Sequence, residues 1–232
     1  GVDSGPVPTQ VLGLNNVVNI AVGGGFTVVR KTDGTVWAWG GSIIATTTPF
    51  QISGLSDITA IAADDGHAVA LKSDGTVWAW GKNASGQLGD GTTTDRPTPV
   101  QVSGLNSIIA ISAGGGFTVV LKGDGTVWAW GDHHGQNSPS TTPFQVPGLS
   151  DITAIAAGGF HTLALKSDGT VWAWGWATDG VLGNGDTRGG STPVQVLGPG
   201  GEGFLNLGQT VPPSSSRATN ITISELSPGR YR

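Results

Sequence analysis

Several residue types that often carry chemistry are absent or scarce in this 232-residue sequence. It contains no cysteine and no methionine, and only 12% of its residues are charged. Without cysteine there is no disulfide framework, no thiolate ligand for zinc and no thiol nucleophile. No apolar run approaches the roughly 18–20 residues of a membrane-spanning helix, so we expect no membrane span. Hydrophobic residues still make up 37% of the sequence, which excludes a disordered, charge-rich chain.

The few charges do not gather by sign. Eleven Lys and Arg residues stand against 16 Asp and Glu residues, which gives a net charge of −5. The basic residues are scattered along the sequence, whereas a nucleic-acid interface needs a basic stripe that follows successive phosphates. We therefore expect no nucleic-acid partner.

A pentapeptide, VWAWG, occurs four times and defines a repeat. Its first Trp lies at positions 37, 78, 128 and 172, which gives spacings of 41, 50 and 44 residues. Each copy follows an apolar run, a Gly-rich step, a segment ending in Lys and an Asp-Gly pair. A variable loop and a Pro-x-Gln segment come after it. A period of this length is typical of propellers, solenoids and other repeat arrays.

The Asp-Gly pairs predict one β-hairpin in every repeat, with positive φ at both turn positions. Each repeat then forms four short antiparallel strands. Alternation places both Trp residues of the pentapeptide on one face of the sheet, and neighbouring repeats must cover that face. The β-propeller is the commonest architecture for such units. The predicted structural residues are Trp37, Trp39, Trp78, Trp80, Trp128, Trp130, Trp172 and Trp174, with the hairpin pairs Asp33, Gly34, Asp74, Gly75, Asp124, Gly125, Asp168 and Gly169.

The four repeats are of two alternating types. Repeats one and three share the sequence GGGFTVV and a short loop before PFQ. Repeats two and four share ALKSDGTVWAWG and a longer Gly-rich loop before PVQV. The four units therefore have the pattern of a duplicated pair.

Residues 66–102, GHAVALKSDGTVWAWGKNASGQLGDGTTTDRPTPVQV, closely resemble a bacterial repeat of the regulator of chromosome condensation propeller family. The resemblance extends over roughly residues 8–198. It implies an all-β propeller of four-stranded antiparallel blades, usually seven of them, each built from about 50 residues. Four blades are recognisable here, at residues 17–54, 55–104, 105–148 and 149–198.

The flanking segments depart from the repeat. Residues 1–16 contain VPTQVLG, which matches the outer strand of a preceding blade. Residues 199–219 are predicted to be a degenerate repeat start and a Pro/Ser-rich linker. Residues 220–232 are predicted to be a β-strand tail that resembles the start of an immunoglobulin-like module. Three interpretations stay open: a fragment of a longer protein, a propeller completed by another copy, or a closed ring of four or five blades.

No catalytic or cofactor-binding constellation is recognisable. The sequence has no Ser-His-Asp order, no paired-Glu spacing and no nucleophile elbow, so we predict no enzyme activity and no cofactor. We also predict no metal site. Asp132, His133 and His134 come nearest to one, but adjacent side chains rarely converge on an ion without a third ligand from elsewhere.

A few single residues depart from the repeat or match a short motif. His67 and His161 take the slot that holds Phe in the other repeats, and we predict a structural role for them. Asp64 and Asp65 replace a Gly pair and are expected to be solvated turn carboxylates. Trp176 is the one Trp outside the pentapeptides and a candidate partner contact. Asn83 and Asn220 fit the N-glycosylation pattern.

These observations predict a non-catalytic scaffold of a secreted or cell-surface protein of bacterial type. It would recognise a protein partner, or itself, through the inter-blade loops at residues 41–49, 82–98, 132–143 and 176–192. One alternative is a structural subunit of an extracellular filament, sheath or surface layer, assembled through open blade edges and the C-terminal strand. Another is an inhibitor of a secreted enzyme, which a resemblance of the fold to a known β-lactamase inhibitor implies.

Overall fold

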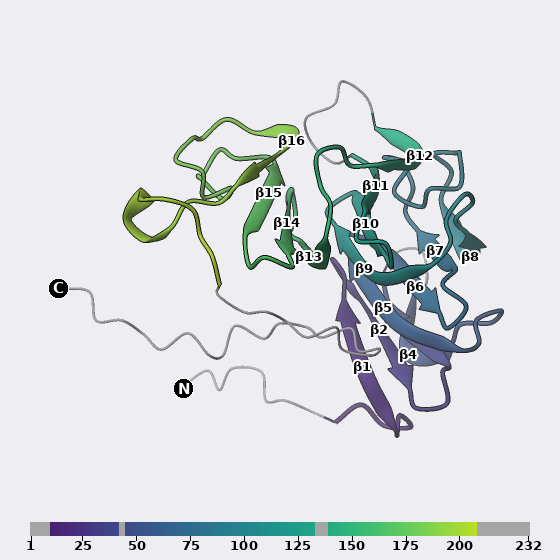
Figure 1. Cartoon of the computed structure of the whole chain (residues 1–232). Coiled ribbons are helices and arrows are strands. Elements are labelled where there is room, and N and C mark those ends of the chain that lie inside the picture. Colours follow the sequence, from purple (N-terminus) through teal and green to yellow (C-terminus); the bar gives the residue numbers. More distant parts are fainter. Residues whose placement is uncertain (1–9, 42–44, 133–138, 208–232) are drawn as a thin grey trace, which may run out of the picture.

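The computed structural model describes residues 10–41, 45–132 and 139–207, which form four antiparallel sheets of four strands each (Figure 1). In each sheet the strands lie side by side in chain order, so each sheet is one blade. The predicted all-β architecture and the four blades are confirmed. Blades one and two comprise β1 (Val17–Val22), β2 (Phe26–Lys31), β3 (Val36–Gly40), β4 (Thr46–Gln51), β5 (Ile58–Asp64), β6 (His67–Lys72), β7 (Val77–Gly81) and β8 (Arg96–Gln101). Blades three and four comprise β9 (Ile108–Gly114), β10 (Phe117–Lys122), β11 (Val127–Gly131), β12 (Ser140–Gln145), β13 (Ile152–Ala157), β14 (His161–Lys166), β15 (Val171–Gly175) and β16 (Gly190–Gln195).

The described parts of the flanking segments, residues 10–16 and 196–207, add little regular structure. Residues 10–16 lie in no strand. After β16, Pro199–Gly201 form a short 3-10 turn, and isolated bridges pair Leu197 with Phe204 and Thr170 with Asn206. The predicted tail at 220–232 lies outside the described residues. In the described part of the chain, no helix is long and apolar enough to cross a membrane.

Every Asp-Gly pair lies in the turn between the second and third strands of its blade. In blade one, the Asp33 carboxylate accepts hydrogen bonds from the Thr35 N–H at 3.0 Å and from Thr35 Oγ1 at 2.6 Å. These bonds hold the pKa of Asp33 below its ordinary value. The same Asp–Thr contacts recur at Asp74, Asp124 and Asp168. Each hairpin turn is therefore fixed by its own side chains.

The turn type differs from the predicted one. Gly34 has a φ of +76°, but Asp33 does not have a positive φ. The Lys31 N–H donates to the Thr35 carbonyl at 3.0 Å, and the Gly34 N–H donates to the Lys31 carbonyl at 3.0 Å. This is a longer loop with glycine in the left-handed position, which widens the hairpin by a bulge. An Asp-Gly pair serves both turn types, so the sequence pattern alone could not separate them.

Each blade has two unlike faces. In blade two, Ile61 and Trp80 lie on the face toward blade one, which we call the tryptophan face. Val69, Val77 and Ala79 lie on the opposite face, toward blade three, which we call the aliphatic face. Residues at the corresponding positions define the same two faces in the other blades. Period-2 alternation along the strands produces this division.

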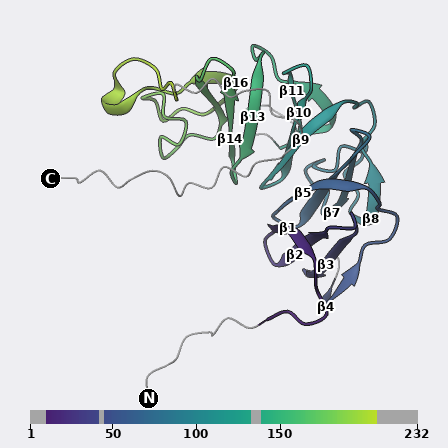
Figure 2. The same cartoon turned by 60° about the horizontal axis from the view of Figure 1, so that its bottom comes forward.

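Blades stack by placing the tryptophan face of one on the aliphatic face of the blade before it. The second Trp of the pentapeptide is the centre of each contact, and its exposed fraction is 1% at Trp80, 0% at Trp130 and 1% at Trp174. Figure 2 shows the four blades as an open arc with blades one and four at its ends. Three inter-blade cores therefore hold the arc together.

Candidate interaction surface

The loops between the third and fourth strands distinguish the two repeat types. In blade two this loop spans residues 82–95 and in blade four it spans 176–189, because β8 and β16 begin earlier than predicted. Both loops lie at the blade end that also carries the Gly-rich step. The Lys82 N–H donates to the Gly66 carbonyl at 2.9 Å, for example. We call this end of the blades the loop end.

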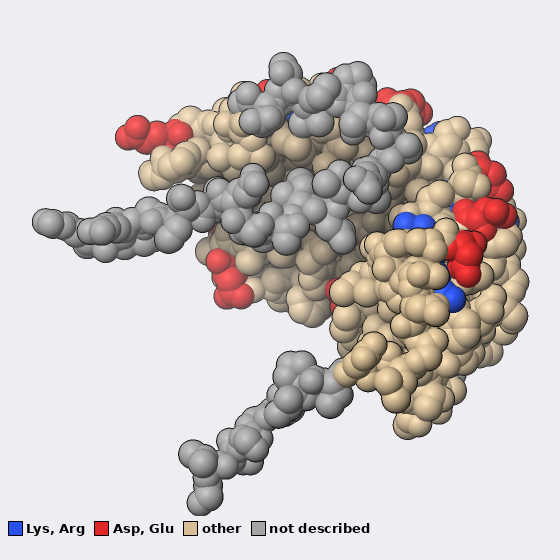
Figure 3. Space-filling view, turned by 90° about the horizontal axis from the view of Figure 1, so that it is seen from below, with Lys and Arg blue, Asp and Glu red and all other residues tan. Residues whose placement is uncertain are grey.

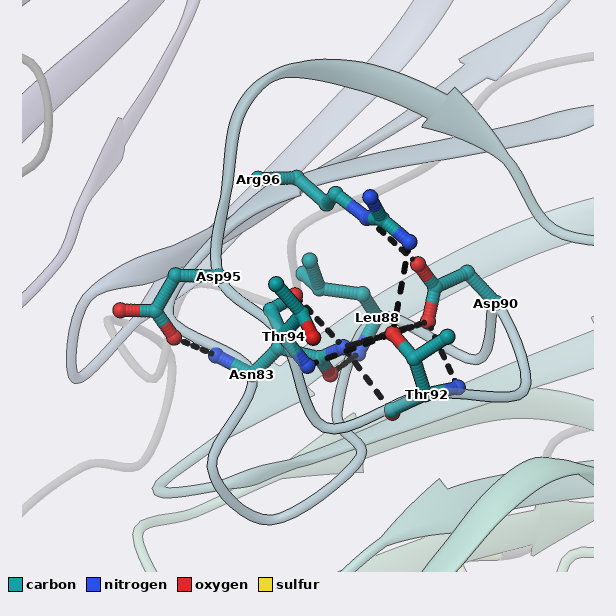
Figure 4. Close-up of polar contacts among 7 residues, drawn as sticks. All are labelled: Asn83, Leu88, Asp90, Thr92, Thr94, Asp95 and Arg96. Carbon is teal, nitrogen blue, oxygen red and sulfur yellow. Dashed lines mark hydrogen bonds and ion pairs between the residues drawn. The ribbon is translucent and has the colours of Figure 1, made fainter.

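Asn83 organises the blade-two loop from its centre (Figure 4). Its side chain is fully buried. Asn83 Nδ2 donates to the carbonyls of Thr92 and Thr94 at 3.0 and 3.1 Å and to Asp90 Oδ1 at 3.2 Å, while Oδ1 accepts the Leu88 N–H at 3.0 Å. A buried amide with these partners fixes the loop conformation. The same burial argues against Asn83 as a glycan acceptor in the folded protein.

A short ion pair closes the outer side of the same loop. Arg96 Nε lies 2.7 Å from Asp90 Oδ2, and the other carboxylate oxygen of Asp90 accepts the Thr92 N–H at 3.0 Å. Partial burial acts to raise the pKa of Asp90, but the hydrogen bonds from Thr92 and Arg96 outweigh it and hold that pKa below its ordinary value. Asp90 is therefore a structural carboxylate of the loop.

The blade-two loop also reaches across to blade three. The backbone carbonyl of Gln87 accepts the Trp130 indole N–H at 2.8 Å and the Thr118 hydroxyl at 2.9 Å. Thr118 Oγ1 lies 3.0 Å from His67 Nε2, so the polar contact continues back into blade two. The loop therefore closes the junction over a buried Trp that the apolar core alone would leave without a hydrogen-bond acceptor.

His67 occupies its slot differently from the aromatic residues of the other blades. In blades one and three the Phe ring lies over a glycine, where a Cβ on Gly23 or Gly114 would overlap it. Blade two has Asp64 at that position, and the His67 ring is instead fully buried against blade three. Burial is the main cause that lowers the pKa of His67 to about 4. Desolvation raises the pKa of Asp64.

The loop end of blade four carries two exposed aromatic side chains, Phe160 from the turn between β13 and β14 and Trp176 from the loop between β15 and β16. Trp176 is 52% exposed and Phe160 is 56% exposed, and the Trp176 N–H donates to the Phe160 carbonyl at 2.8 Å. Trp176 Nε1 donates to Thr178 Oγ1 at 2.7 Å. Our sequence analysis singled out Trp176 and missed Phe160. The signal was available, because glycine takes the Phe160 position in the other three repeats.

The remaining predicted site residues lie apart from this surface or outside the described residues. His133, His134 and Asn220 belong to the segments that are not described. Among the residues that the structure does describe, no group of three His, Cys, Asp or Glu side chains is placed to hold a metal ion. On the face drawn in Figure 3, Lys and Arg atoms form isolated patches between acidic ones.

Family models match most of the chain. The model described as the regulator of chromosome condensation (RCC1) repeat matches residues 74–121, 124–165 and 168–206. A second RCC1 repeat model matches residues 17–42, 58–87, 108–136 and 152–181. No curated protein sequence matches the chain.

Three solved structures with the same fold match this chain over about half of their own length. Human WBSCR16 is 24% identical with a TM-score of 0.70, and the match covers 80% of this chain and 54% of that protein. Yeast RCC1 (Prp20), solved with Kap60, is 22% identical with a TM-score of 0.70 and coverages of 83% and 51%. Prp20p from Saccharomyces cerevisiae, described with its binding properties to Gsp1p and histones, is 22% identical with a TM-score of 0.68. That match covers 83% of this chain and 52% of Prp20p. The chain thus spans about half the length of these proteins, and the likeness shows the fold.

Proposed function

Because the chain belongs to the regulator of chromosome condensation (RCC1) repeat family, we propose that it is a non-catalytic propeller scaffold that recognises a protein partner through its loop end. Proteins with this fold bind other proteins: yeast RCC1 (Prp20) was solved with Kap60 bound, and Prp20p has been described with its binding properties to Gsp1p and histones. None of these partners is carried over to this chain, whose loops have their own sequences. The proposal concerns the class of function and the surface that performs it.

The exposed pair Phe160 and Trp176 is the observation that carries this proposal. Large aromatic side chains are enriched at the energetic centres of protein interfaces. The repeats provide an internal control, because blade two builds the same loop end with Gly66 and Lys82 at the equivalent positions. A blade of this fold therefore does not require aromatic residues at these two positions, which supports a binding role for them.

We place the protein outside the cell or at its surface. The chain has no cysteine and no methionine, the residues that oxidation attacks first. Its low charge and its many Gly and Thr residues are compatible with the same environment. Exposed loops on a stiff scaffold also suit recognition by several weak contacts at once.

The experiment replaces the pair with its blade-two counterparts. Immobilised chain is incubated with the proteins secreted by its source, and the Phe160→Gly/Trp176→Lys double variant is compared with wild type. We expect one or a few proteins to bind wild type and to be lost from the double variant. The matched control is Ile109→Thr, which removes an exposed apolar side chain from blade three and introduces the residue that blades two and four carry. Equal capture by all three proteins, or no specific capture, would contradict the proposal.

A second candidate function is a structural subunit of an extracellular filament, sheath or surface layer. It is favoured by the exposure of Ile20 and Val22 on the tryptophan face of blade one, where they are 65% and 68% exposed. Discrete, non-growing particles at high concentration in negative-stain micrographs would rule it out. If the captured partner is a secreted enzyme that loses activity on binding, recognition takes the more specific form of inhibition.

A further inference from the structure

The two ends of the arc expose side chains whose counterparts in blade two are buried. At the blade-one end, Ile20 is 65% exposed, whereas its counterpart in blade two, Ile61, is 7% exposed. At the blade-four end, Val181 is 43% exposed, whereas its counterpart Gln87 is 5% exposed. Blade one therefore presents an uncovered tryptophan face. At blade four the loop residue Val181 is exposed, while Val171 and Ala173 on the aliphatic face are only 9% and 0% exposed.

The alternation of repeat types decides which internal junction these two ends could reproduce. At the junction between blades two and three, a long loop covers a Trp that pairs across strands with a Thr, Trp130 with Thr118. Blade one carries the same cross-strand pair, Trp39 with Thr27, as blade four also does with Trp174 and Thr162. Blades one and three alone share the segment GGGFTVV. Blade four carries the long loop. Blade four followed by blade one therefore repeats the order of blade two followed by blade three.

The loop of blade four is already folded for this contact. Its Leu182 is buried like Leu88, with exposed fractions of 2% and 0%. The Gly183 N–H donates to the Gly180 carbonyl at 3.0 Å, as the Gly89 N–H donates to the Gly86 carbonyl at 3.0 Å. The glycines keep their left-handed conformations too, with φ of +69° at Gly180 and +73° at Gly86. The Val181 carbonyl is therefore presented as the Gln87 carbonyl is in blade two.

Leu207, which follows blade four in the chain, binds blade four as Ile108 binds blade two. The Leu207 N–H donates to the Gly169 carbonyl at 2.9 Å, just as the Ile108 N–H donates to the Gly75 carbonyl at 3.3 Å. Leu207 is 51% exposed, while Ile108 is 4% exposed. The position that Ile108 fills in the blade-two junction is thus occupied, but nothing in the described residues covers it from outside.

We propose that a second copy of this chain docks head to tail on these faces, with its blade one stacked on blade four as blade three stacks on blade two. In this contact the Trp39 indole and the Thr27 hydroxyl of one copy donate to the Val181 carbonyl of the other. Ile20 and Val22 pack against the exposed end of blade four, which includes Val181 and Leu207. The contact joins two different surfaces, so two copies close into a ring or further copies extend the array. It differs from pairing of strand edges, because the faces of the sheets meet.

The test is a complementation of two charged variants. Ile20→Glu places a carboxylate on the blade-one face, and Val181→Glu places one on the blade-four face; both side chains are exposed in the single chain, so both variants should fold. Wild type is expected to associate as its concentration rises from about 1 μM to about 1 mM, the range of moderate to weak affinity, in sedimentation and light scattering. Each variant alone is expected to stay monomeric.

An equimolar mixture of the two variants separates head-to-tail docking from other association. Ile20→Glu keeps a competent blade four, and Val181→Glu keeps a competent blade one, so the mixture is expected to form a dimer of one copy each and nothing larger. Ile109→Glu, which charges an equally exposed apolar side chain in blade three, should associate like wild type. A monomeric wild type throughout, variants that still associate, or a mixture that stays monomeric would each overturn the proposal. Binding of a secreted partner through Phe160 and Trp176 is measured separately, and neither variant alters those residues.

Discussion

The junction between blades two and three and the junction between blades one and two place the same Trp in different surroundings. The Trp130 indole N–H donates to the Gln87 carbonyl at 2.8 Å. The Trp80 indole is equally buried, but its N–H has no hydrogen-bond partner among the residues that the structure describes. Blade two contributes a long loop to its junction, and blade one contributes a short one.

The difference separates two contributions to blade stacking, an apolar one and a polar one. Both junctions bury a Trp in an apolar cluster, so the aliphatic contact alone suffices to stack blades. The long loop adds a polar closure, because it supplies an acceptor for the indole and excludes water from the junction. An unsatisfied buried donor costs roughly 1–3 kcal/mol. The loop therefore stabilises the junction between blades two and three, one of the three junctions in the described chain.

The largest expected effect compares an internal Trp with a terminal one. Trp130→Ala removes a fully buried side chain, and we expect the free energy of unfolding to fall by about 4 kcal/mol. Trp39→Ala removes a half-buried side chain at the open end of blade one. It should lower the free energy of unfolding by about half as much as Trp130→Ala or less. Urea unfolding at low protein concentration measures both. Equal losses would show that the tryptophan face of blade one is already covered.

Acid should weaken the junction that contains His67. Its pKa is lowered from 6.5 to about 4 by burial, so the folded protein keeps this His neutral where the unfolded chain takes up a proton. Stability from this group is therefore complete above pH 6.5 and is lost as the pH falls to about 4, by about 3 kcal/mol in all.

Urea unfolding at pH 7 and at pH 4 measures this loss for wild type and for two variants. His67→Gln lowers the stability at pH 7 but should flatten its dependence on pH. His161→Gln serves as the matched control in blade four and should keep the dependence of wild type. An unchanged acid sensitivity in His67→Gln would assign the effect to other groups.

The centre of the blade-two loop gives a smaller effect. Asn83→Ala removes the amide that holds the loop, and we expect a loss of about 2 kcal/mol. Blade four carries Ala177 at this position, so the loop should keep its fold and the loss should come from the orphaned partners. Asp95→Ala, which removes only the carboxylate that accepts the Asn83 N–H, should cost less. A larger loss of stability in Asp95→Ala than in Asn83→Ala would mean that the loop depends more on the Asp95 carboxylate than on the buried Asn83 amide.

The smallest effect tests the indole N–H itself. Trp130→Phe takes a satisfied donor from one junction, and Trp80→Phe takes an unsatisfied one from the other. Both substitutions lose the same ring volume. We therefore expect the free energy of unfolding to fall by about 1 kcal/mol more in Trp130→Phe than in Trp80→Phe. Chemical unfolding of the two variants side by side provides the comparison. A larger loss in Trp80→Phe would contradict the assignment of the long loop as the polar closure.

Local patterns predicted the blades and missed what depends on contacts between them. The pentapeptide and the Asp-Gly pair indicated strands, hairpin positions and the stacking role of the Trp residues, because alternation and turn chemistry act within one repeat. The burial of Asn83 and the contact of Gln87 with Trp130 depend on how a loop folds back and where the next blade lies. Phe160 was detectable only by comparing repeat positions, where aromatic replaces glycine.

The most direct test of the account measures exchange of the indole N–H groups by NMR on chain with ¹⁵N-labelled Trp. We expect the Trp130 N–H to exchange slowly at every concentration, because it donates to the Gln87 carbonyl within one chain. The Trp39 N–H should exchange fast in dilute samples and become protected as the concentration rises and a second copy covers blade one. Fast exchange of Trp39 at all concentrations, or its protection in dilute monomer, would contradict the claim that the two ends of the arc complete one another.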